Sequence, residues 1–433
     1  MEFLQLKLKD ELLKALQYKG YKIPSPVQKE CIPPLLEGKD LMGIAQTGTG
    51  KTAAFLLPIL HRVMTKDMGA VAKAPCVLIL APTRELAAQI GESCKHYAKF
   101  TTITHTVIYG GVGQNPQVAA LKRGVHILIA TPGRLLDLME QRHVFLNNVE
   151  VFVLDEADRM LDMGFIHDVK RIVELIPKQR QTMFFSATMS REVEQLARKL
   201  LINPVHVEVT PQATTVEKIK QEVLFVDQEK KDDVLIELLQ KEHLNKVLVF
   251  TRTKSRANKL AKKLNAETIK ADAIHGNKTQ NQRMQALGNF QKGRTRILIA
   301  TDIAARGIDV ERISHVINYD LPNEPENYVH RIGRTARAGK EGVAYSFCAA
   351  DESGYWHDIE KLTRQKIDVM DHRHHSKRAQ DATGPLSRTA HKQRQNNAQK
   401  NSGSRRFAEK KKPSSRKKFY RSSAGAKQSN KRR

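Results

Sequence analysis

Short apolar runs that alternate with helical patterns constrain the fold of this 433-residue chain more than any other feature. The runs are rich in Val, Leu, Ile and Phe, and they lie at residues 76–80, 126–130, 151–154, 182–185, 246–250, 296–300, 315–318 and 343–347. Strands that are almost wholly apolar and alternate with helices are typical of parallel sheets covered on both faces. The sequence therefore predicts two α/β domains of similar construction.

Changes in composition mark the predicted domain boundaries. The segment 208–215 is short, polar and interrupted by a proline, as expected of a linker. From Asp371 onward the apolar periodicity disappears, and Ser, Gln, Asn, Lys and Arg dominate. We predict domains at residues 1–207 and 218–370, a linker at 208–217, and a disordered basic tail at 371–433.

The positive charge of the chain is unevenly distributed. The formal net charge is +27, and residues 371–433 alone carry 20 Lys and Arg against 3 Asp and Glu. Such a concentration of basic residues indicates a polyanionic partner, and nucleic acid is the first candidate.

The cysteines and the N-terminus indicate the cellular compartment. Cys31, Cys76, Cys94 and Cys348 are far apart and form no C-x-x-C pair, which argues against a disulfide framework or a zinc site. The first sixteen residues lack the apolar core of a signal peptide, and no apolar run approaches the roughly 20 residues of a membrane helix. We therefore expect a soluble, cytoplasmic protein without a membrane partner.

The segment AQTGTGKT matches a phosphate-binding loop in which alanine replaces the first glycine. Backbone N–H groups at such a strand-to-helix turn can surround phosphates, with Lys51 neutralising their charge and the Thr52 hydroxyl binding Mg²⁺. A glycine-rich turn without a ligand is the alternative. The predicted nucleotide contacts here are Ala45, Gln46, Thr47, Gly48, Thr49, Gly50, Lys51 and Thr52.

Two carboxylates, Asp155 and Glu156, follow a wholly apolar predicted strand. At the carboxyl edge of a parallel sheet such side chains point into a ligand crevice. Asp155 would hold Mg²⁺ through water, while Glu156 would orient and deprotonate an attacking water. A solvated acidic strand end is the alternative, but the strand carries no other charge and a phosphate-binding loop precedes it.

The segment before the phosphate-binding loop contains a candidate for base recognition. A glutamine amide such as Gln28 can bond adenine bidentately, and an aromatic ring such as Phe3 can pack against the base. By itself, a surface loop with a buried aromatic residue is the commoner interpretation.

Together with further segments, these features resemble a DEAD-box ATP-dependent RNA helicase of superfamily 2, most closely the bacterial RhlE-type branch. The resemblance runs from Phe3 to about Ala350, and Ser25 replaces the usual threonine. Its motifs are AQTGTGKT (45–52), PTREL (82–86), Gly110-Gly111, TPGR (131–134), DEAD (155–158), SAT (186–188), VFTRTK (249–254), TDIAARGID (301–309) and HRIGRTAR (330–337).

The resemblance implies two RecA-like domains that use ATP and Mg²⁺ as cofactors. It assigns Arg334 and Arg337 as arginine fingers from the second domain and places Gly307 and Asp309 near the ribose. It also implies that Ser186 and Thr188 couple ATP binding to RNA binding, and that His330 and Arg331 link the second domain to the DEAD strand and to ATP. The implied interdomain coupling residues are Asp158, Ser186, Thr188, His330 and Arg331.

The resemblance further implies an RNA site that reads the backbone and is largely independent of sequence. Small residues, hydroxyls and arginines suit phosphates and 2′-OH groups better than base edges. The implied contacts are Pro82, Thr83, Arg84, Gly111, Thr131, Gly133, Arg134, Arg252, Thr301 and Arg306. Ribosomal-precursor or RNA-decay complexes are the implied protein partners.

The function expected from this set is local separation of RNA duplexes, with RNA-stimulated hydrolysis of ATP to ADP and phosphate. An ATP-locked RNA clamp or scaffold is one alternative, and slow turnover with stable RNA retention would indicate it. A DNA helicase is the other, and the DEAD, TPGR and TDIAARGID segments weigh against it.

Overall fold

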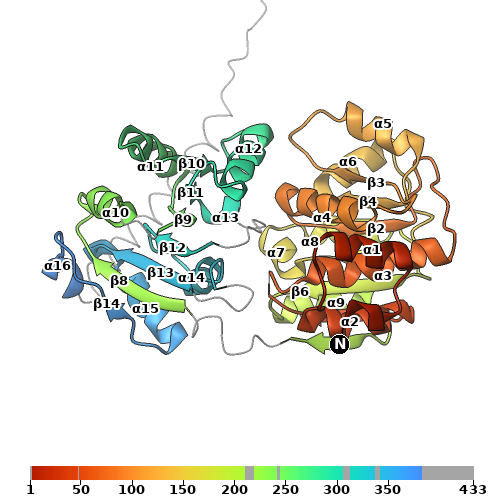
Figure 1. The fold of residues 1–433 in the computed structure, drawn as a ribbon, viewed down its shortest axis with the longest axis horizontal. Helices are drawn as coiled ribbons and strands as arrows, with labels where there is room; N and C mark the ends of the chain where they lie inside the picture. Colours follow the sequence, from red (N-terminus) through yellow and green to blue (C-terminus); the bar gives the residue numbers. More distant parts are fainter. Residues whose placement is uncertain are drawn as a thin grey trace, which may run out of the picture. The chain divides into compact units, whose positions relative to one another are not determined.

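The computed structural model describes residues 2–46, 48–209, 219–240, 244–305, 313–336 and 342–382, and these residues contain two seven-stranded sheets. Every pair of neighbouring strands in both sheets is parallel. The predicted α/β class with two parallel-sheet domains is therefore confirmed (Figure 1).

The first sheet has the strand order β3-β4-β2-β5-β6-β1-β7. Its strands are β1 (Leu41–Ile44), β2 (Val77–Leu80), β3 (His105–Ile108), β4 (Ile127–Ala130), β5 (Val151–Leu154), β6 (Gln181–Ser186) and β7 (Val205–Glu208). Its helices are η1 (Phe3–Leu6), α1 (Asp10–Tyr18), α2 (Pro26–Leu36), α3 (Lys51–Thr65), α4 (Arg84–Tyr97), α5 (Asn115–Arg123), α6 (Pro132–Glu140), α7 (Ala157–Asp162), α8 (Ile166–Val173) and α9 (Arg191–Leu200).

Successive side chains of a strand enter opposite cores, which explains why the strands read as continuous apolar runs. Val151 and Val153 of β5 pack into the cluster that includes α2, α3 and α4. Phe152 and Leu154 of the same strand pack into the cluster that includes α6, α8 and α9. Because strand side chains alternate between faces, a sheet with helices on both sides needs an apolar residue at every position.

The second sheet has the order β10-β11-β9-β12-β13-β8-β14, which matches the first sheet strand for strand if the first strand of each domain corresponds. Its strands are β8 (Ile219–Phe225), β9 (Val247–Phe250), β10 (Ala271–Ile274), β11 (Ile297–Ala300), β12 (His315–Asn318), β13 (Gly342–Cys348) and β14 (Asp368–Val369). Its helices are α10 (Lys231–Leu239), α11 (Lys254–Ala266), α12 (Gln280–Gln291), α13 (Asp302–Ala305), α14 (Pro325–Ile332), η2 (Ala350–Glu352), α15 (Ser353–Thr363) and α16 (Lys377–Gln380).

The second domain extends beyond the boundary predicted at Met370. Ala379 of α16 is fully buried in the same cluster as Trp356, and Ser376 N donates to Phe225 O at 2.9 Å. One short turn has too few residues to produce an apolar period, so the sequence pattern missed it. The second domain therefore includes α16, whereas most of the predicted linker and the predicted tail from residue 383 onward lie outside the described residues.

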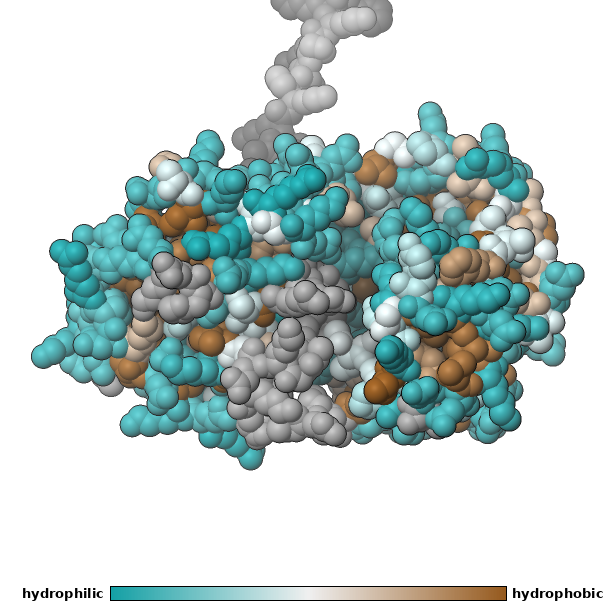
Figure 2. Space-filling model, in the orientation of Figure 1, coloured by the Kyte–Doolittle hydropathy of each residue, from teal (hydrophilic) through white to brown (hydrophobic). Residues whose placement is uncertain are grey.

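The visible face of the described residues is mostly hydrophilic, and hydrophobic residues form separate patches on it (Figure 2). In the described part of the chain, no helix is long and apolar enough to cross a membrane.

The buried carboxylate of Asp40 connects segments that are distant in sequence at the start of β1. Its Oδ1 accepts a hydrogen bond from Thr182 N at 2.7 Å, and its Oδ2 accepts one from Ile202 N at 2.8 Å. Asp40 O also accepts from Val205 N at 2.8 Å. This residue therefore holds β1 in register with β6 and β7, and β1 leads directly into the glycine-rich loop.

We expect Asp40→Ala to lower the free energy of unfolding of the first domain by about 3 kcal/mol. It removes two charge-assisted hydrogen bonds and leaves buried N–H donors unpaired. Denaturant unfolding followed by circular dichroism measures the loss. Trp356, the one tryptophan of the chain, lies in the core of the second domain, so its fluorescence transition should stay in place.

Lys39→Ala is the matched control, because the Lys39 side chain is 56% exposed and pairs with Glu37, which is 60% exposed. An Asp40→Ala protein as stable as this control would contradict the anchoring role.

Candidate functional site

The glycine-rich loop lies between β1 and α3, at the carboxyl edge of the first sheet. Gly48 and Gly50 have φ values of +86° and +98°, a left-handed conformation that side chains disfavour. A Cβ at Gly50 would also lie 2.5 Å from Gln28 Nε2. Thr49 Oγ1 donates to Gln46 O at 2.8 Å and closes the turn. The loop thus leads its backbone into the N-terminus of a fifteen-residue helix.

Lys51 and Asp155 bring opposite charges into this buried edge of the sheet. Lys51 is 6% exposed and Asp155 is 2% exposed. Within the described residues, Lys51 Nζ and Asp155 Oδ1 are buried and have no hydrogen-bond partner. Such groups are costly unless a ligand satisfies them. Burial, opposed in part by Lys51, raises the pKa of Asp155 to about 6.

This arrangement suits a phosphate chain with a divalent cation. The buried Lys51 ammonium can bind phosphate oxygens. The free Asp155 carboxylate oxygen, which follows β5, can bind a hard cation. The residues present are therefore chemically compatible with both groups that the sequence predicts.

Glu156 follows Asp155 in an unusual backbone conformation. Its φ and ψ are both 54°, the left-handed region that non-glycine residues rarely occupy and that is often found at functional sites. Its carboxylate is buried, and Oε2 accepts from Arg159 Nη1 at 2.6 Å. Arg159 was not among the predicted residues. The sequence could have indicated it, because Arg159 lies three residues after Glu156, a spacing at which opposite charges on a helix can pair.

The DEAD and SAT segments form one hydrogen-bond network. Asp158 Oδ2 accepts from Ala187 N at 3.2 Å, from Thr188 N at 3.0 Å and from Thr188 Oγ1 at 3.0 Å. Ser186 Oγ accepts from Asp158 N at 3.3 Å and donates to Thr188 O at 2.7 Å. The structure therefore brings together three of the five predicted coupling residues.

The side-chain amide of Gln28 forms hydrogen bonds with the backbone of the same domain. Its Oε1 accepts from Ser25 N at 2.9 Å, and its Nε2 donates to Gly50 O at 3.1 Å. An amide has two acceptor lone pairs and two donor hydrogens, so one of each remains. Phe3 is only 5% exposed and belongs to the core of the first domain, which leaves little of its ring available to a base.

The predicted RNA contacts of the first domain follow β2, β3 and β4, which are neighbours in the sheet. Gly111 has a φ of +79°, and a Cβ there would collide with the Arg84 guanidinium. Thr83 caps α4 by accepting from Leu86 N at 3.2 Å. Pro82 and Thr83 are buried, whereas Arg84 is partly exposed. The nucleotide candidates follow β1 and β5, on the other half of the same edge.

The TPGR segment begins α6. Gly133 is exposed with open space around it, and Thr131 is buried. Arg134 is held inside the domain, since Nη2 donates to Val112 O at 3.3 Å and Nε lies 3.3 Å from Asp137 Oδ2. The Arg134 side chain is 12% exposed, and its contacts position the loop that contains Val112.

In the second domain, the Arg331 side chain binds other residues of the same domain. Its guanidinium binds both carboxylate oxygens of Asp302, at 2.6 and 2.7 Å, and donates to Asp320 O at 2.7 Å. Arg331 is 2% exposed, and it connects α14 to α13. Sequence could not foresee this, because Asp302 is distant in the chain.

Two other predicted residues lie near the same helix. Arg334 is 5% exposed, and its Nε donates to His330 O at 3.3 Å; His330 is exposed. Arg252 and the buried Thr301 follow β9 and β11, which are neighbouring strands. Thr47, Arg306, Gly307, Asp309 and Arg337 lie outside the described residues.

Two family models match this chain. Residues 25–196 match the model described as DEAD/DEAH box helicase, and residues 230–339 match the helicase conserved C-terminal domain. The first match contains β1 to β6 of the first sheet, and the second contains β9 to β12 of the second sheet.

The chain is also similar to characterised relatives. It is 44% identical to the DEAD-box ATP-dependent RNA helicase CshA of Bacillus cereus over 369 residues, which covers 85% of this chain and 69% of that protein. It is 42% identical to CshA of Bacillus subtilis, covering 85% and 74%. The structure resembles S. cerevisiae Dbp5 bound to RNA and ADP BeF3, with a TM-score of 0.75, 35% identity and coverage of 85% and 95%. The two sheets are thus tandem RecA-like domains, and the chain belongs to the DEAD-box ATP-dependent RNA helicase family of ATP-hydrolysing enzymes.

Proposed function

We propose that this chain binds RNA along its backbone with both domains, separates short duplexes locally, and hydrolyses ATP as RNA stimulates it. The observation that carries the proposal is the pair of buried, unsatisfied charged atoms, Lys51 Nζ and Asp155 Oδ1, beside the glycine-rich loop. An ATP-metal complex would satisfy both at once.

The nucleotide roles follow from the chemistry of each residue. Residues 45–52 surround the phosphates with backbone N–H groups, and Lys51 neutralises their charge. Thr52 and Asp155 would hold Mg²⁺, which would neutralise charge that develops on the phosphates. Glu156 orients and deprotonates the attacking water, held in its left-handed conformation at the start of α7.

The second domain supplies positive charge to the transition state. Arg334 is the candidate arginine finger among the described residues. Arg337 is proposed as a second one from its position in the motif. Because Arg334 is 5% exposed, we expect its side chain to be repositioned when nucleotide binds. Gly307 and Asp309 are proposed to contact the ribose. His330 is proposed to contact the first domain, whereas Arg331 acts through its ion pair with Asp302.

RNA binds at the predicted backbone positions, with different roles for exposed and buried residues. Gly111 and Gly133 offer exposed backbone, and Arg84 and Arg252 offer partly exposed guanidinium groups. Pro82, Thr83, Thr131, Arg134 and Thr301 are buried or internally bonded, so they shape these loops unless RNA opens them. Arg306 completes the set by its motif position. The network of Asp158 with Ser186 and Thr188 joins the loops after β5 and β6, and it is proposed to couple ATP binding to RNA binding.

The branch of the family, the protein partners and the cellular location can also be proposed. We place the chain in the RhlE-type branch from its motifs, although both bacterial relatives above are named CshA. Partners among ribosomal-precursor or RNA-decay complexes follow from the resemblance alone. The four unpaired, buried cysteines support a reducing, cytoplasmic location.

We expect Glu156→Gln to retain ATP and RNA binding while lowering the steady-state rate of ATP hydrolysis by about 10²–10⁴-fold. The carboxamide preserves shape but cannot accept the proton of the attacking water. Lys51→Ala should instead weaken ATP binding itself, because it removes charge from the phosphate site. Wild-type turnover in Glu156→Gln would remove this residue from the proposed role.

Gln28→Ala should affect nucleotide binding in two ways. Loss of a bidentate contact would erode the preference for ATP over GTP by about 1–3 kcal/mol. Loss of the Gly50 O hydrogen bond should also weaken binding of both nucleotides, because the loop is no longer held in place. Equilibrium titrations with ATP and GTP separate the two effects. Unchanged preference would mean that adenine is read elsewhere.

The basic tail is proposed to tether RNA. Because α16 belongs to the second domain, the tail should be removed after α16 and not after Met370. Truncation after Ala382 preserves α16, whereas truncation after Met370 would remove it. Residues 383–433 carry 17 Lys and Arg and one Glu. Their removal should make the slope of log K against log salt shallower by about 0.7 for each lost phosphate contact. ATP turnover at saturating RNA should stay the same, and an unchanged affinity and slope would contradict RNA tethering.

A further inference from the structure

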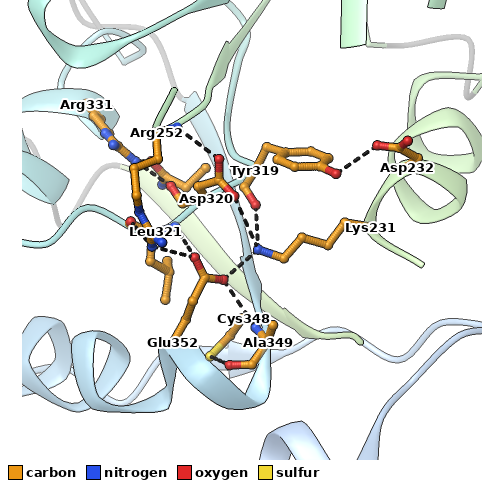
Figure 3. A network of polar contacts seen from close by, with 11 residues as sticks. Lys231, Asp232, Arg252, Tyr319, Asp320, Leu321, Arg331, Cys348, Ala349 and Glu352 are labelled. Atoms are coloured by element: carbon orange, nitrogen blue, oxygen red, sulfur yellow. Dashed lines mark hydrogen bonds and ion pairs between the residues drawn. The ribbon is translucent and has the colours of Figure 1, made fainter. Parts of the chain in front are cut away.

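Charged side chains from four segments converge in the second domain (Figure 3). Lys231 of α10 is completely buried, and its Nζ lies 2.5 Å from Glu352 Oε2, 2.8 Å from Tyr319 O and 3.7 Å from Asp320 Oδ1. Glu352, at the end of η2, is 1% exposed. A buried lysine and a buried glutamate in such contact form an ion pair that water hardly screens.

The same carboxylate holds Arg252, which follows β9. Arg252 Nη2 donates to Glu352 Oε1 at 2.8 Å and to Leu321 O at 3.1 Å, and its guanidinium carbon lies 5.5 Å from the centre of the Tyr355 ring. The Arg252 side chain is 28% exposed. Lys231 and Arg252 thus approach Glu352 from different sides, and only the arginine reaches solvent (Figure 3).

One negative charge is therefore divided between two positive ones. Lys231 takes one carboxylate oxygen, and Arg252 takes the other. Asp320 supplies a second negative charge, since its Oδ1 lies 3.7 Å from Lys231 Nζ and its Oδ2 accepts from the backbone N of Arg252 at 2.8 Å. With Lys231 present, Glu352 neutralises only part of the Arg252 guanidinium. The remainder of that charge can attract a phosphate.

We infer that Lys231 and Glu352 set the RNA affinity of the second domain by determining how much of the Arg252 charge is available to an RNA phosphate. The inference rests on the proposed RNA role of Arg252. Lys231 and Glu352 are too deeply buried to touch RNA, so both act through Arg252 as positioning residues. No motif of the sequence marks either of them.

The two residues are expected to act in opposite directions. Lys231→Met leaves Glu352 to Arg252 alone, which neutralises the guanidinium more fully and weakens RNA binding. Glu352→Gln keeps an oxygen that can accept from Arg252 but removes the competing charge, so RNA binding becomes stronger. Both substitutions break a buried ion pair and should destabilise the domain. A merely structural role would therefore change RNA affinity in the same direction for both.

The test measures ATP hydrolysis by the full chain against the concentration of single-stranded oligouridine RNA. The half-stimulating RNA concentration should rise about two- to fivefold in Lys231→Met and fall by a similar factor in Glu352→Gln, as for one partly exposed charge pair. The rate at saturating RNA and the KM for ATP should not change. Lys230→Met is the matched control, because Lys230 is adjacent, 54% exposed and paired with Asp233.

Shifts in the same direction, or no shift, would overturn the inference. Arg252→Gln separates this failure from that of the proposed function: if it leaves the RNA dependence unchanged, Arg252 is not an RNA contact. Should a single variant fail to fold, the double variant Lys231→Met, Glu352→Gln removes both members of the buried ion pair, and Asp320 keeps its hydrogen bond from Arg252 N. It should bind RNA at least as tightly as the wild type, and weaker binding would overturn the inference.

Discussion

Parallel strand pairing is the constraint on which the rest of this structure depends. Because all strands of a sheet run the same way, the loops that follow them meet at one edge. The strand order then divides that edge in the first domain. Loops after β3, β4 and β2 carry the RNA candidates, and loops after β5 and β1 carry the nucleotide candidates. The SAT segment follows β6, between the two nucleotide strands, and it bonds directly to Asp158. The DEAD and SAT segments are thus joined by hydrogen bonds within the nucleotide half of this edge.

The two domains treat buried charge differently, and the difference is functional. In the first domain, Lys51 and Asp155 each keep a buried polar atom unsatisfied, which lowers stability and prepares a site for a charged ligand. In the second domain, Lys231 and Glu352 satisfy each other at 2.5 Å. Such a pair adds little net stability compared with apolar packing, yet breaking it is costly. We therefore interpret it as a device that holds Arg252 and its charge in one arrangement.

Several motif residues have partners that change their expected roles. Arg331 binds Asp302, and Arg134 binds Val112 O and Asp137. Phe3 is buried in the core of the first domain. Motif membership marked these residues as candidates for the site. It did not separate side chains that would contact a ligand from side chains that shape the loops which do. That distinction depends on hydrogen-bond partners located tens or hundreds of residues away, as with Glu352 and Arg252.

The sequence by itself determined the two α/β domains, the eight apolar runs that became strands, and the phosphate-binding loop and carboxylate pair, because strand periodicity and glycine-rich turns are local properties. Only the tertiary structure decided the strand order, the Asp40 anchor and the Lys231–Glu352 pair. It also extended the second domain beyond the predicted boundary at Met370 to include Ala379. These features require specific residues distant in the chain to meet, and no local pattern encodes which of many similar charged residues will do so.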